Sequence, residues 1–455
     1  MRRSAWQWFV VSSILVLSPA VSGETRPQYG GVLHVAVRAA NMSLDPTDEA
    51  QSPSFAGRSL TLLLFDTLLS TDENGRIQPS LATSWQAIPG SQRWQFRIRR
   101  RVQFDDGTPF TAESAAASLR VSEPAWSVTA EGDSMTIEWD GAEFDLLAEL
   151  SLPRNAIAKR TVDNKLSGTG PFHVSDWQPG RRLTMAAQDG YWRGRPFVDS
   201  IEIEMGKSFR DQMTALELGK TDLVEVAPEQ AARIPQERRR VASSDAVELI
   251  ALIFNRDAAT PEEKLLRKAV SLVVERGSIR TVMLQGSGTP TGAILPNWMS
   301  GYSFVFPSDA DLPRAREARQ QVRTIPTWTL GYDGSDPLAR LLAERIALNA
   351  KDAGLSLQPT TAGSATMQLA RIPLASPEPW IALADVARRV GMNVAKKQGG
   401  IEDLYAAEVA LLATQRVIPL FHLPVSYASG TNVKNWSVRP DGTCTFGDAW
   451  LGTNP

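Results

Sequence analysis

The sequence predicts an α/β protein of two to four domains. Its 455 residues exceed what one hydrophobic core normally holds, about 250–300 residues. Stretches with the two-residue period of a strand also alternate along the chain with stretches that have the 3.6-residue period of a helix. Such alternation is typical of lobes in which helices cover a mainly parallel sheet.

The first elements are a strand, a loop and a buried helix. The run VLHVAV at 32–37 indicates a buried strand, and the proline-containing run at 41–46 ends it. Apolar residues recur at helical spacing over 60–68, so we expect a short buried helix there. The charged, glycine-containing segment at 72–75 then turns the chain.

A hairpin and a capped helix follow. Apolar and polar residues alternate over 94–98 and again over 102–104, as a strand with one solvent-facing side requires. Asp106-Gly107 tolerates a tight turn. Thr111 is the expected cap of the next helix, whose first turn carries Glu113, an acid suited to the positive end of the helix.

In the middle of the chain, the sequence patterns that predict secondary structure are weak up to residue 168 and strong after it. Between 120 and 168 only a short strand pair is legible, with 134–139 as one member before a turn at Asp140-Gly141. Strand alternation is strong over 183–205. Ser208 with an acid three residues later forms a capping-box signature that starts a helix.

The second half continues the alternation. We expect a strand at 249–255 and helices that begin at Thr260 and Asp336, each followed by proline in the first helical turn. A further helix is predicted over 402–414. The apolar run VIPLFHL at 417–423 predicts a final buried strand.

The N-terminal sequence predicts that the protein is exported. Residues 1–23 have the pattern of a secretory signal, with two arginines, an apolar run and then small residues, so the mature chain would start near Glu24. A retained anchor is the alternative. Cys444 is the only cysteine and lies far from the signal, so we expect neither an internal disulfide nor a lipid anchor. These features predict an exported protein without a lipid anchor.

Charge and composition exclude some partners. The formal net charge is −2, which argues against nucleic acid or an anionic membrane surface as the main partner. Hydrophobic residues make up 43% of the chain, as is ordinary for a globular protein. The thirteen tryptophans suit aromatic walls around a ligand and suit a core equally well.

Signatures of enzymes and metal sites are weak. Gly219-Lys220-Thr221 imitates the end of a phosphate loop, but Thr214 stands where that loop needs glycine. The three histidines are far apart in the sequence and form no metal-binding motif, although they could still converge in space. They are His34, His173 and His422. We therefore expect no metal or other cofactor, and a hydrolase remains the alternative.

Three blocks of sequence carry a family resemblance. SLATSW followed by FRIRRRVQFDDGTPFTAES lies within 60–120, and GTGPFHVSDWQPG begins the block at 168–228. The third block is FNRDAATPEEKLLRKAVSLVVERGSI, followed by GTPTGAILP. In this order they resemble the bacterial extracellular solute-binding proteins of family 5, the peptide- and nickel-binding components of ABC importers.

The resemblance implies a two-lobe periplasmic binding protein fold with a hinge. The first lobe would be discontinuous, with a shortened extra subdomain. The expected parts are 24–57, 168–253 and 424–455 for the first lobe, 58–167 for the subdomain and 254–423 for the second lobe. The implied function is capture of a small solute, peptide-like or another small organic molecule, by a monomer that delivers it to an inner-membrane permease. A secreted hydrolase and a sensor or interaction protein that has lost transport remain alternatives.

The resemblance also implies a ligand site between the lobes. The loop after the first strand lies near ligand in relatives, and a plain Asx-type turn is the alternative for it. Peptide-binding relatives hold the peptide amino group with an aspartate in a segment that corresponds here to 371–380, which contains no aspartate. Glu378 is the possible substitute. The expected ligand contacts are Asn41, Met42, Ser43, Glu378, Trp380 and Tyr427, and core packing is the alternative for the two aromatic residues.

Overall fold

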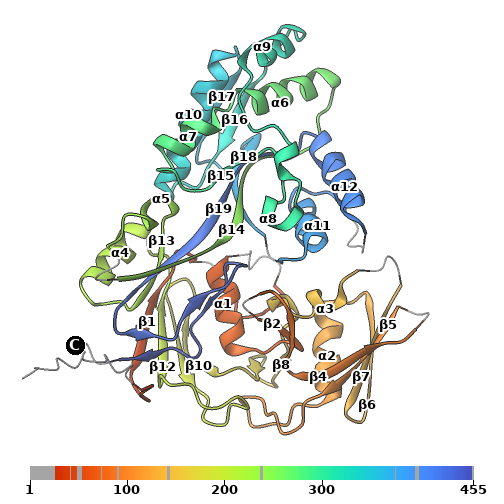
Figure 1. Ribbon diagram of the computed structural model, residues 1–455, viewed down its shortest axis with the longest axis vertical. Coiled ribbons are helices and arrows are strands. Elements are labelled where there is room, and N and C mark those ends of the chain that lie inside the picture. Colours follow the sequence, from red (N-terminus) through yellow and green to blue (C-terminus); the bar gives the residue numbers. More distant parts are fainter. Residues whose placement is uncertain are drawn as a thin grey trace, which may run out of the picture.

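The computed structural model consists of two lobes and a subdomain (Figure 1). It describes residues 26–40, 42–48, 54–72, 74–89, 92–140, 144–235, 239–374, 376–394 and 399–452. The expected signal at 1–23 and Asn41 lie outside the described residues. The mixture of helices with parallel and antiparallel strands confirms the predicted α/β class.

One sheet runs through both lobes. Among the described residues it has eleven strands in the order β10-β11-β12-β1-β13-β19-β14-β18-β16-β17, with β15 paired to β19. The strands on the first-lobe side are β1 (Val32–Ala36), β10 (Phe172–Gln178), β11 (Arg182–Ala187), β12 (Ser200–Glu204) and β13 (Leu223–Val226). Those on the second-lobe side are β15 (Thr289–Pro290), β16 (Thr327–Gly331), β17 (Ser356–Thr360) and β18 (Met367–Pro373).

Two long antiparallel strands connect the lobes. They are β14 (Arg239–Phe254) and β19 (Val417–Gly430), which pair along most of their length. On β19, Leu420 and Leu423 belong to a core of the second lobe, whereas Tyr427 belongs to the core of the first. The chain therefore passes from one lobe to the other within β14 and again within β19. These two extended strands form the hinge.

Helices cover the sheet in each lobe. In the first lobe these are α1 (Phe55–Leu64), α4 (Phe209–Glu217) and the short α5 (Pro228–Ala231). In the second lobe they are α6 (Pro261–Val273), α7 (Arg276–Val282), α8 (Asn297–Ser300), η3 (Ser303–Val305), α9 (Leu312–Gln320), α10 (Pro337–Asp352), α11 (Pro379–Arg389) and α12 (Ile401–Ala413). None of the helices in the described part of the chain has the length and apolar character to cross a membrane.

The subdomain has its own sheet and core. Its larger sheet has the order β4-β5-β7-β6, built from β4 (Ala82–Ala87), β5 (Arg93–Ile98), β6 (Trp126–Glu131) and β7 (Ser134–Trp139), and α2 (Ala112–Ser122) packs beside β6 and β7. Smaller elements are β2 (Leu69–Thr71), β3 (Ile77–Pro79), α3 (Leu146–Glu149), η2 (Pro153–Asn155), β8 (Ala158–Arg160) and β9 (Leu166–Gly168). The turn before β7 lies at Gly132, whose φ of 58° suits glycine, and β6 is the partner strand.

The C-terminal segment returns to the first lobe. Short strands pair as β20 (Val433–Lys434) with β23 (Trp450–Leu451), and β21 (Ser437–Val438) with β22 (Cys444–Thr445). β22 packs beside α1, and Cys444 donates its backbone N–H to the Ser59 hydroxyl oxygen at 2.9 Å. This segment closes one side of the first lobe.

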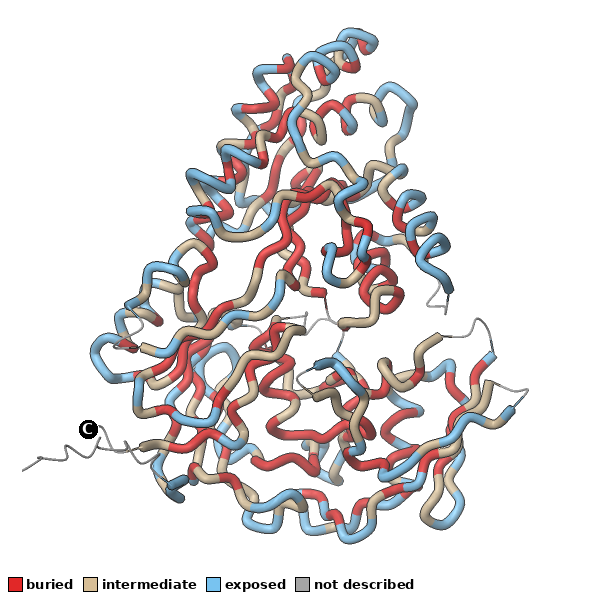
Figure 2. The backbone as a smooth tube through the Cα atoms, viewed as in Figure 1, coloured by how far each residue is buried: buried red, intermediate tan, exposed pale blue. Residues whose placement is uncertain are grey.

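The hydrophobic cores are separate. Leu33, Phe172 and Ile201 belong to the first-lobe core, Phe96 to the subdomain core, and Phe254 to a second-lobe core. Figure 2 shows the buried residues concentrated inside each lobe. Because burial of apolar surface is the main stabilising term, each lobe keeps its own stability when the two lobes move relative to each other.

Two local expectations are wrong. The helix over 60–68 ends at Leu64, whose carbonyl oxygen accepts the N–H of Gly170 at 3.0 Å, and the chain turns away there. A Cβ on Gly168 would lie 2.0 Å from the same oxygen, so a crossing segment fixes the end of α1. The strand expected at 102–104 is a single bridge at Gln103, because Arg101 adopts a φ of 62° that interrupts the alternation.

The packing of α1 places this helix in the first lobe and not in the subdomain. Its residues Leu60, Leu63 and Leu64 belong to the first-lobe core, while the subdomain core begins at Leu68. The expected start of the subdomain at 58 therefore falls inside a first-lobe helix.

Candidate functional site

A cavity of about 370 Å³ lies between the lobes. We call it the cleft. The first lobe contributes residues 46–48, Gly57, Arg58 and Thr61, and the subdomain contributes Ser122, Glu123 and 152–154. The second lobe contributes Ile372, Pro373, Asp385, Arg388 and Arg389. Since the walls come from both sides of the hinge, relative motion of the lobes changes the size of this cavity.

The N-terminal turn of α1 places Arg58 in the wall. Ser54 caps the helix by accepting the N–H of Gly57 at 2.9 Å. The Arg58 guanidinium donates to the carbonyl oxygen of Asp441 at 3.1 Å and lies over the ring of Phe55 at 4.6 Å. Burial lowers the pKa of Arg58, and the nearby carboxylate of Asp441 opposes this effect. The helix thus presents a fixed, partly desolvated cation to the cleft.

An ion pair crosses the cleft. Arg154, from η2 of the subdomain, lies with its Nη1 2.8 Å from Oδ2 of Asp385 on α11. The same guanidinium makes two further hydrogen bonds to Glu149, of 2.6 and 2.8 Å, in a bidentate arrangement. Burial acts to lower the pKa of Arg154, but Glu149 and Asp385 together raise it above its ordinary value. Arg154 therefore remains charged and links the subdomain to the second lobe.

α11 supplies the charged residues on the opposite wall. Asp385, Arg388 and Arg389 lie at spacings of three and four residues, which places them on one side of the helix. Arg388 Nη2 donates to Oδ1 of Asp385 at 3.3 Å. Burial lowers the pKa of Arg389, and Asp385 opposes this shift. Both arginines lie in the last turn, where the negative end of the helix dipole favours cations.

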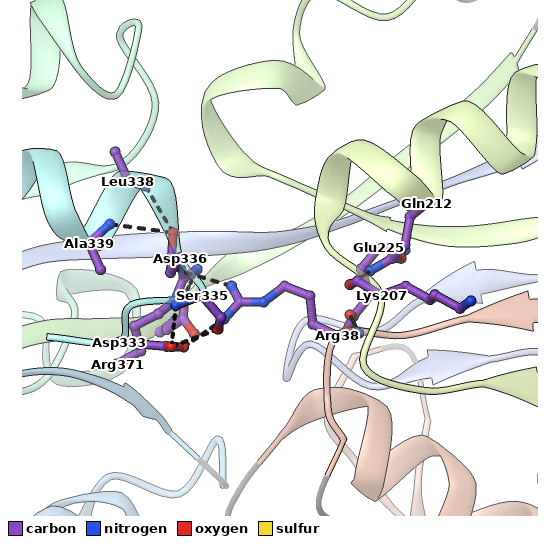
Figure 3. A network of polar contacts seen from close by, with 11 residues as sticks. Arg38, Lys207, Gln212, Glu225, Asp333, Ser335, Asp336, Leu338, Ala339 and Arg371 are labelled. Carbon is purple, nitrogen blue, oxygen red and sulfur yellow. Dashed lines mark hydrogen bonds and ion pairs between the residues drawn. The ribbon is translucent and has the colours of Figure 1, made fainter. Parts of the chain in front are cut away.

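A second set of contacts joins the lobes near the hinge (Figure 3). Arg38 follows β1 in the first lobe, and its guanidinium lies 3.4 Å from Asp336 and 3.7 Å from Asp333 in the second lobe. Asp336 also caps α10 and lies 3.1 Å from Arg371, which pairs with Glu248. Burial acts to lower the pKa of Arg371, but Glu248 and Asp336 raise it above its ordinary value. This cluster, like the cleft pair, holds the lobes in contact.

The residues expected from the sequence occupy other places. Met42 is buried in the first-lobe core, and the Ser43 hydroxyl accepts the N–H of Asp45 at 3.1 Å. Tyr427 is buried in the first-lobe core too, next to Cys444. The structure brings none of these three described residues to the wall of the cleft.

The expected segment of the second lobe is part of α11. Glu378 caps the helix by accepting the N–H of Ile381 at 2.7 Å, and burial raises the pKa of its carboxyl group. Trp380 is 4% exposed and belongs to a second-lobe core. The lining of the cleft comes instead from the other end of the helix, at 385–389.

Sequence reasoning missed the charged residues of the cleft. The spacing of Asp385, Arg388 and Arg389 was a usable signal, since it places three charges on one side of a helix. Arg154 gave no such signal, because it lies in the part of the chain where the family resemblance is weakest. Its partner Asp385 is 231 residues away in the sequence.

The histidines do not converge in the described structure. His422 is 2% exposed on β19, and its Nε2 lies 2.9 Å from the carbonyl oxygen of Ile294. Burial lowers the pKa of His422 to about 4. His34 lies at the surface with Nδ1 3.2 Å from Asp222. Among the residues that the structure describes, no group of three or more His, Cys, Asp or Glu side chains is arranged to hold a metal ion.

Comparisons with known proteins agree on one family. Residues 76–373 match the family model described as bacterial extracellular solute-binding proteins, family 5 Middle. The nickel-binding protein NikA of Staphylococcus aureus is 24% identical over 296 residues, which are 62% of this chain and 58% of that protein. The oligopeptide-binding protein AppA of Bacillus subtilis is 24% identical over 329 residues, which are 65% of this chain and 59% of that protein. The sequence alignments thus span less than two thirds of either relative.

Solved structures show the same fold. The structure of S. aureus NikA in complex with Ni(L-His)2 has a TM-score of 0.79 and 18% identity, and the match covers 92% of this chain and 99% of that one. The structure of AgaA from A. tumefaciens in complex with agropinic acid has a TM-score of 0.78 and 17% identity, with coverage of 93% and 99%. These matches confirm the predicted two-lobe architecture.

Proposed function

The chain belongs to the bacterial extracellular solute-binding proteins of family 5, and we propose that it captures a small solute between its two lobes and delivers it to the permease of an ABC importer. The observation that carries this proposal is the cleft, whose wall is formed by both lobes and crossed by the Arg154–Asp385 ion pair. A solute held there touches both lobes and so favours the closed arrangement over the open one.

The separate cores and the two-strand hinge support a capture mechanism. Lobes with independent cores can open without unfolding, and closure removes a bound solute from water. The lining offers charges of both signs together with apolar surface from Leu152, Pro153 and Ile372. Such a wall suits a small organic molecule that carries polar groups.

We infer the class of solute from the ligands of related proteins and from the position of Glu378. Relatives are named for nickel, oligopeptides and D,D-dipeptides, and a structural neighbour holds agropinic acid, so the fold accepts different ligands. The carboxylate of Glu378 already accepts a backbone N–H as a helix cap, which leaves it poorly placed to hold a free amine. We therefore propose a peptide-like or other small organic solute and expect unmodified short peptides to bind poorly.

The proposal also covers the compartment in which the protein acts and the partner to which it delivers the solute. Family 5 proteins are periplasmic or extracellular binding proteins, so we propose that this chain acts in the periplasm, as an unlipidated monomer, and binds its solute without changing it. The partner is an inner-membrane permease.

The experiment is mass spectrometry of protein purified from its native compartment under mild conditions. We expect a stoichiometric, unmodified small molecule that is released on denaturation. Ser122→Trp places an indole in the cleft and should abolish the copurified mass, whereas Ser127→Trp, at an exposed position of β6, is the matched control and should keep it.

Two results would contradict the proposal. Equal retention of the molecule by both tryptophan variants would place it outside the cleft. Conversion of members of a compound library, lost in Ser122→Trp, would instead support a secreted hydrolase that uses the same cavity.

A further inference from the structure

A second, larger cavity of about 1520 Å³ lies in the first lobe at its border with the subdomain and is open to solvent. We call it the lobe cavity. Its walls come from α1, the loop around Arg193, the start of β14 and the C-terminal segment 434–450, which lies beside α1 (Figure 1). From α1, Ser59, Leu62 and Leu63 line the lobe cavity, whereas Gly57, Arg58 and Thr61 line the cleft. The helix therefore separates two distinct spaces.

Basic residues predominate around the lobe cavity. The lining contains Arg26, Arg193, Arg240, Lys434 and Arg439 against only Asp66 and Asp448. Within the described part of the chain, no ion pair is formed by Arg240, Lys434 or Arg439. An excess of cations that converge on one concave surface attracts anions, and a concave wall strengthens that attraction.

The main acid of the lining is already engaged. Asp66 accepts hydrogen bonds from Thr169, Tyr191 and Trp192, of 3.0, 3.0 and 2.8 Å. Burial raises the pKa of Asp66, and the bond from Trp192 opposes this shift. Its carboxylate is thus committed to the protein's own donors and does not neutralise the cations of the C-terminal segment.

Trp436 provides an independent sign of a ligand. The side chain lines the lobe cavity, is only 2% exposed, and its buried Nε1–H has no acceptor in the described structure. Leaving a buried donor without an acceptor is costly, and such groups in folded proteins are uncommon. The guanidinium of Arg240 lies over the same indole at 5.1 Å from the ring centre. A cation and an unused donor therefore meet at one aromatic residue.

We propose that the lobe cavity is a second binding site, which takes an organic anion bearing carboxylate or phosphate groups. Arg240 and Arg439 supply charge to the oxyanion, and the Trp436 indole N–H supplies a hydrogen bond. Leu62, Pro171 and other apolar residues of the lining favour an organic body over a bare ion. The site is formed by the first lobe and the adjoining edge of the subdomain, without any residue of the second lobe. It goes beyond the proposed solute capture, because it requires neither the cleft nor lobe closure.

The test uses the full-length chain and two probes, citrate for a carboxylate and glucose 6-phosphate for a phosphate. Calorimetry should show saturable binding of at least one probe, with a stoichiometry near one. Binding should weaken as salt is added, since exposed charges are screened. Whichever probe binds more tightly identifies the preferred oxyanion.

The variants locate the probe. Arg240→Gln combined with Arg439→Gln should weaken binding at least about tenfold, because both positive charges are removed, and Trp436→Phe should weaken it several-fold by removing one donor. Arg240 is exposed and Arg439 is only half-buried, so these substitutions leave the core intact. Ser122→Trp, which fills the cleft, should leave probe binding unchanged.

The opposite pattern would overturn the inference. If neither probe binds, or if binding survives the arginine variants, the lobe cavity is not an anion site. Loss of probe binding in Ser122→Trp alone would assign the anion to the cleft. None of these outcomes affects the proposed capture of a solute, which is tested by the copurified molecule.

Discussion

Asp385→Asn should open the molecule. The substitution keeps the size of the side chain and removes the charge that faces Arg154 across the cleft at 2.8 Å. Arg154 keeps its bidentate contact with Glu149, so the variant does not leave a buried cation without a partner. Because the pair joins the subdomain to the second lobe, removing it destabilises the closed state, in which the two groups meet, and leaves the open state unaffected.

The size of the effect follows from burial and geometry. The two side chains are 26% and 16% exposed, so solvent screens the pair less than it screens a surface ion pair. A hydrogen bond between charged groups contributes roughly 1.5–3 kcal/mol net, and asparagine retains a neutral acceptor that recovers part of it. We expect a loss of about 1.4 kcal/mol from the closed state, which is about a tenfold change in the ratio of closed to open molecules.

Single-molecule energy transfer between the lobes measures that ratio. Dyes attached to cysteines introduced at the exposed positions Glu131 and Lys264 report the distance between the subdomain and the second lobe. The native Cys444 is buried, and burial raises the pKa of its thiol, so it should not compete for the dye. Asp176→Asn is the matched control, because it removes a surface carboxylate whose partner lies in the same lobe.

An unchanged distance distribution in Asp385→Asn would refute this reasoning. The same conclusion follows if the control variant opens the molecule as much, since the effect would then come from net charge and not from the ion pair across the cleft.

Five further outcomes are expected. Arg38→Gln should open the lobes by a smaller factor, about two- to fivefold in the same assay, because its ion pairs of 3.4 and 3.7 Å are longer and partly exposed. His422→Gln should reduce the acid sensitivity of folding. The pKa of His422 is about 4 in the folded chain against about 6.5 when unfolded, so the unfolded state binds more protons between these values and stability falls as the pH is lowered. The variant should remove up to about 1.4 kcal/mol per pH unit of that fall, measured by thermal unfolding at about pH 7 and about pH 5. Glu378→Gln should cost up to about 1 kcal/mol of stability in denaturant unfolding, because glutamine keeps an oxygen that can cap α11 but removes the carboxylate from the positive end of the helix. Unmodified di- and tripeptides should give little heat in calorimetry with either protein. A thiol reagent should modify Cys444 only after unfolding, and rapid modification of the native protein would contradict its burial.

Helix starts were the most predictable part of the fold. Thr111, Ser208, Thr260 and Asp336 each accept a backbone N–H of the following turn, as their sequence neighbourhoods predicted. A cap depends on residues within one turn of chain, so local sequence contains the needed information. The strand period was equally informative over 183–205, where two paired strands formed.

Helix ends and side-chain surroundings were less predictable. The end of α1 at Leu64 depends on Gly168 and Gly170, which approach from a segment about a hundred residues away. Trp380 suited a ligand wall and a core equally well in the sequence, and only the packing of the second lobe placed it in a core.

The sequence by itself determined the fold class, the family and the starts of the helices, because each depends on short motifs or on residue periodicity. The tertiary structure decided which residues face the cleft. Arg154 and Asp385 meet across 231 residues of chain, at a distance set by how three separate cores position η2 and α11. Such a contact is the sum of many packing interactions, none of which is local, and no motif near either residue records it.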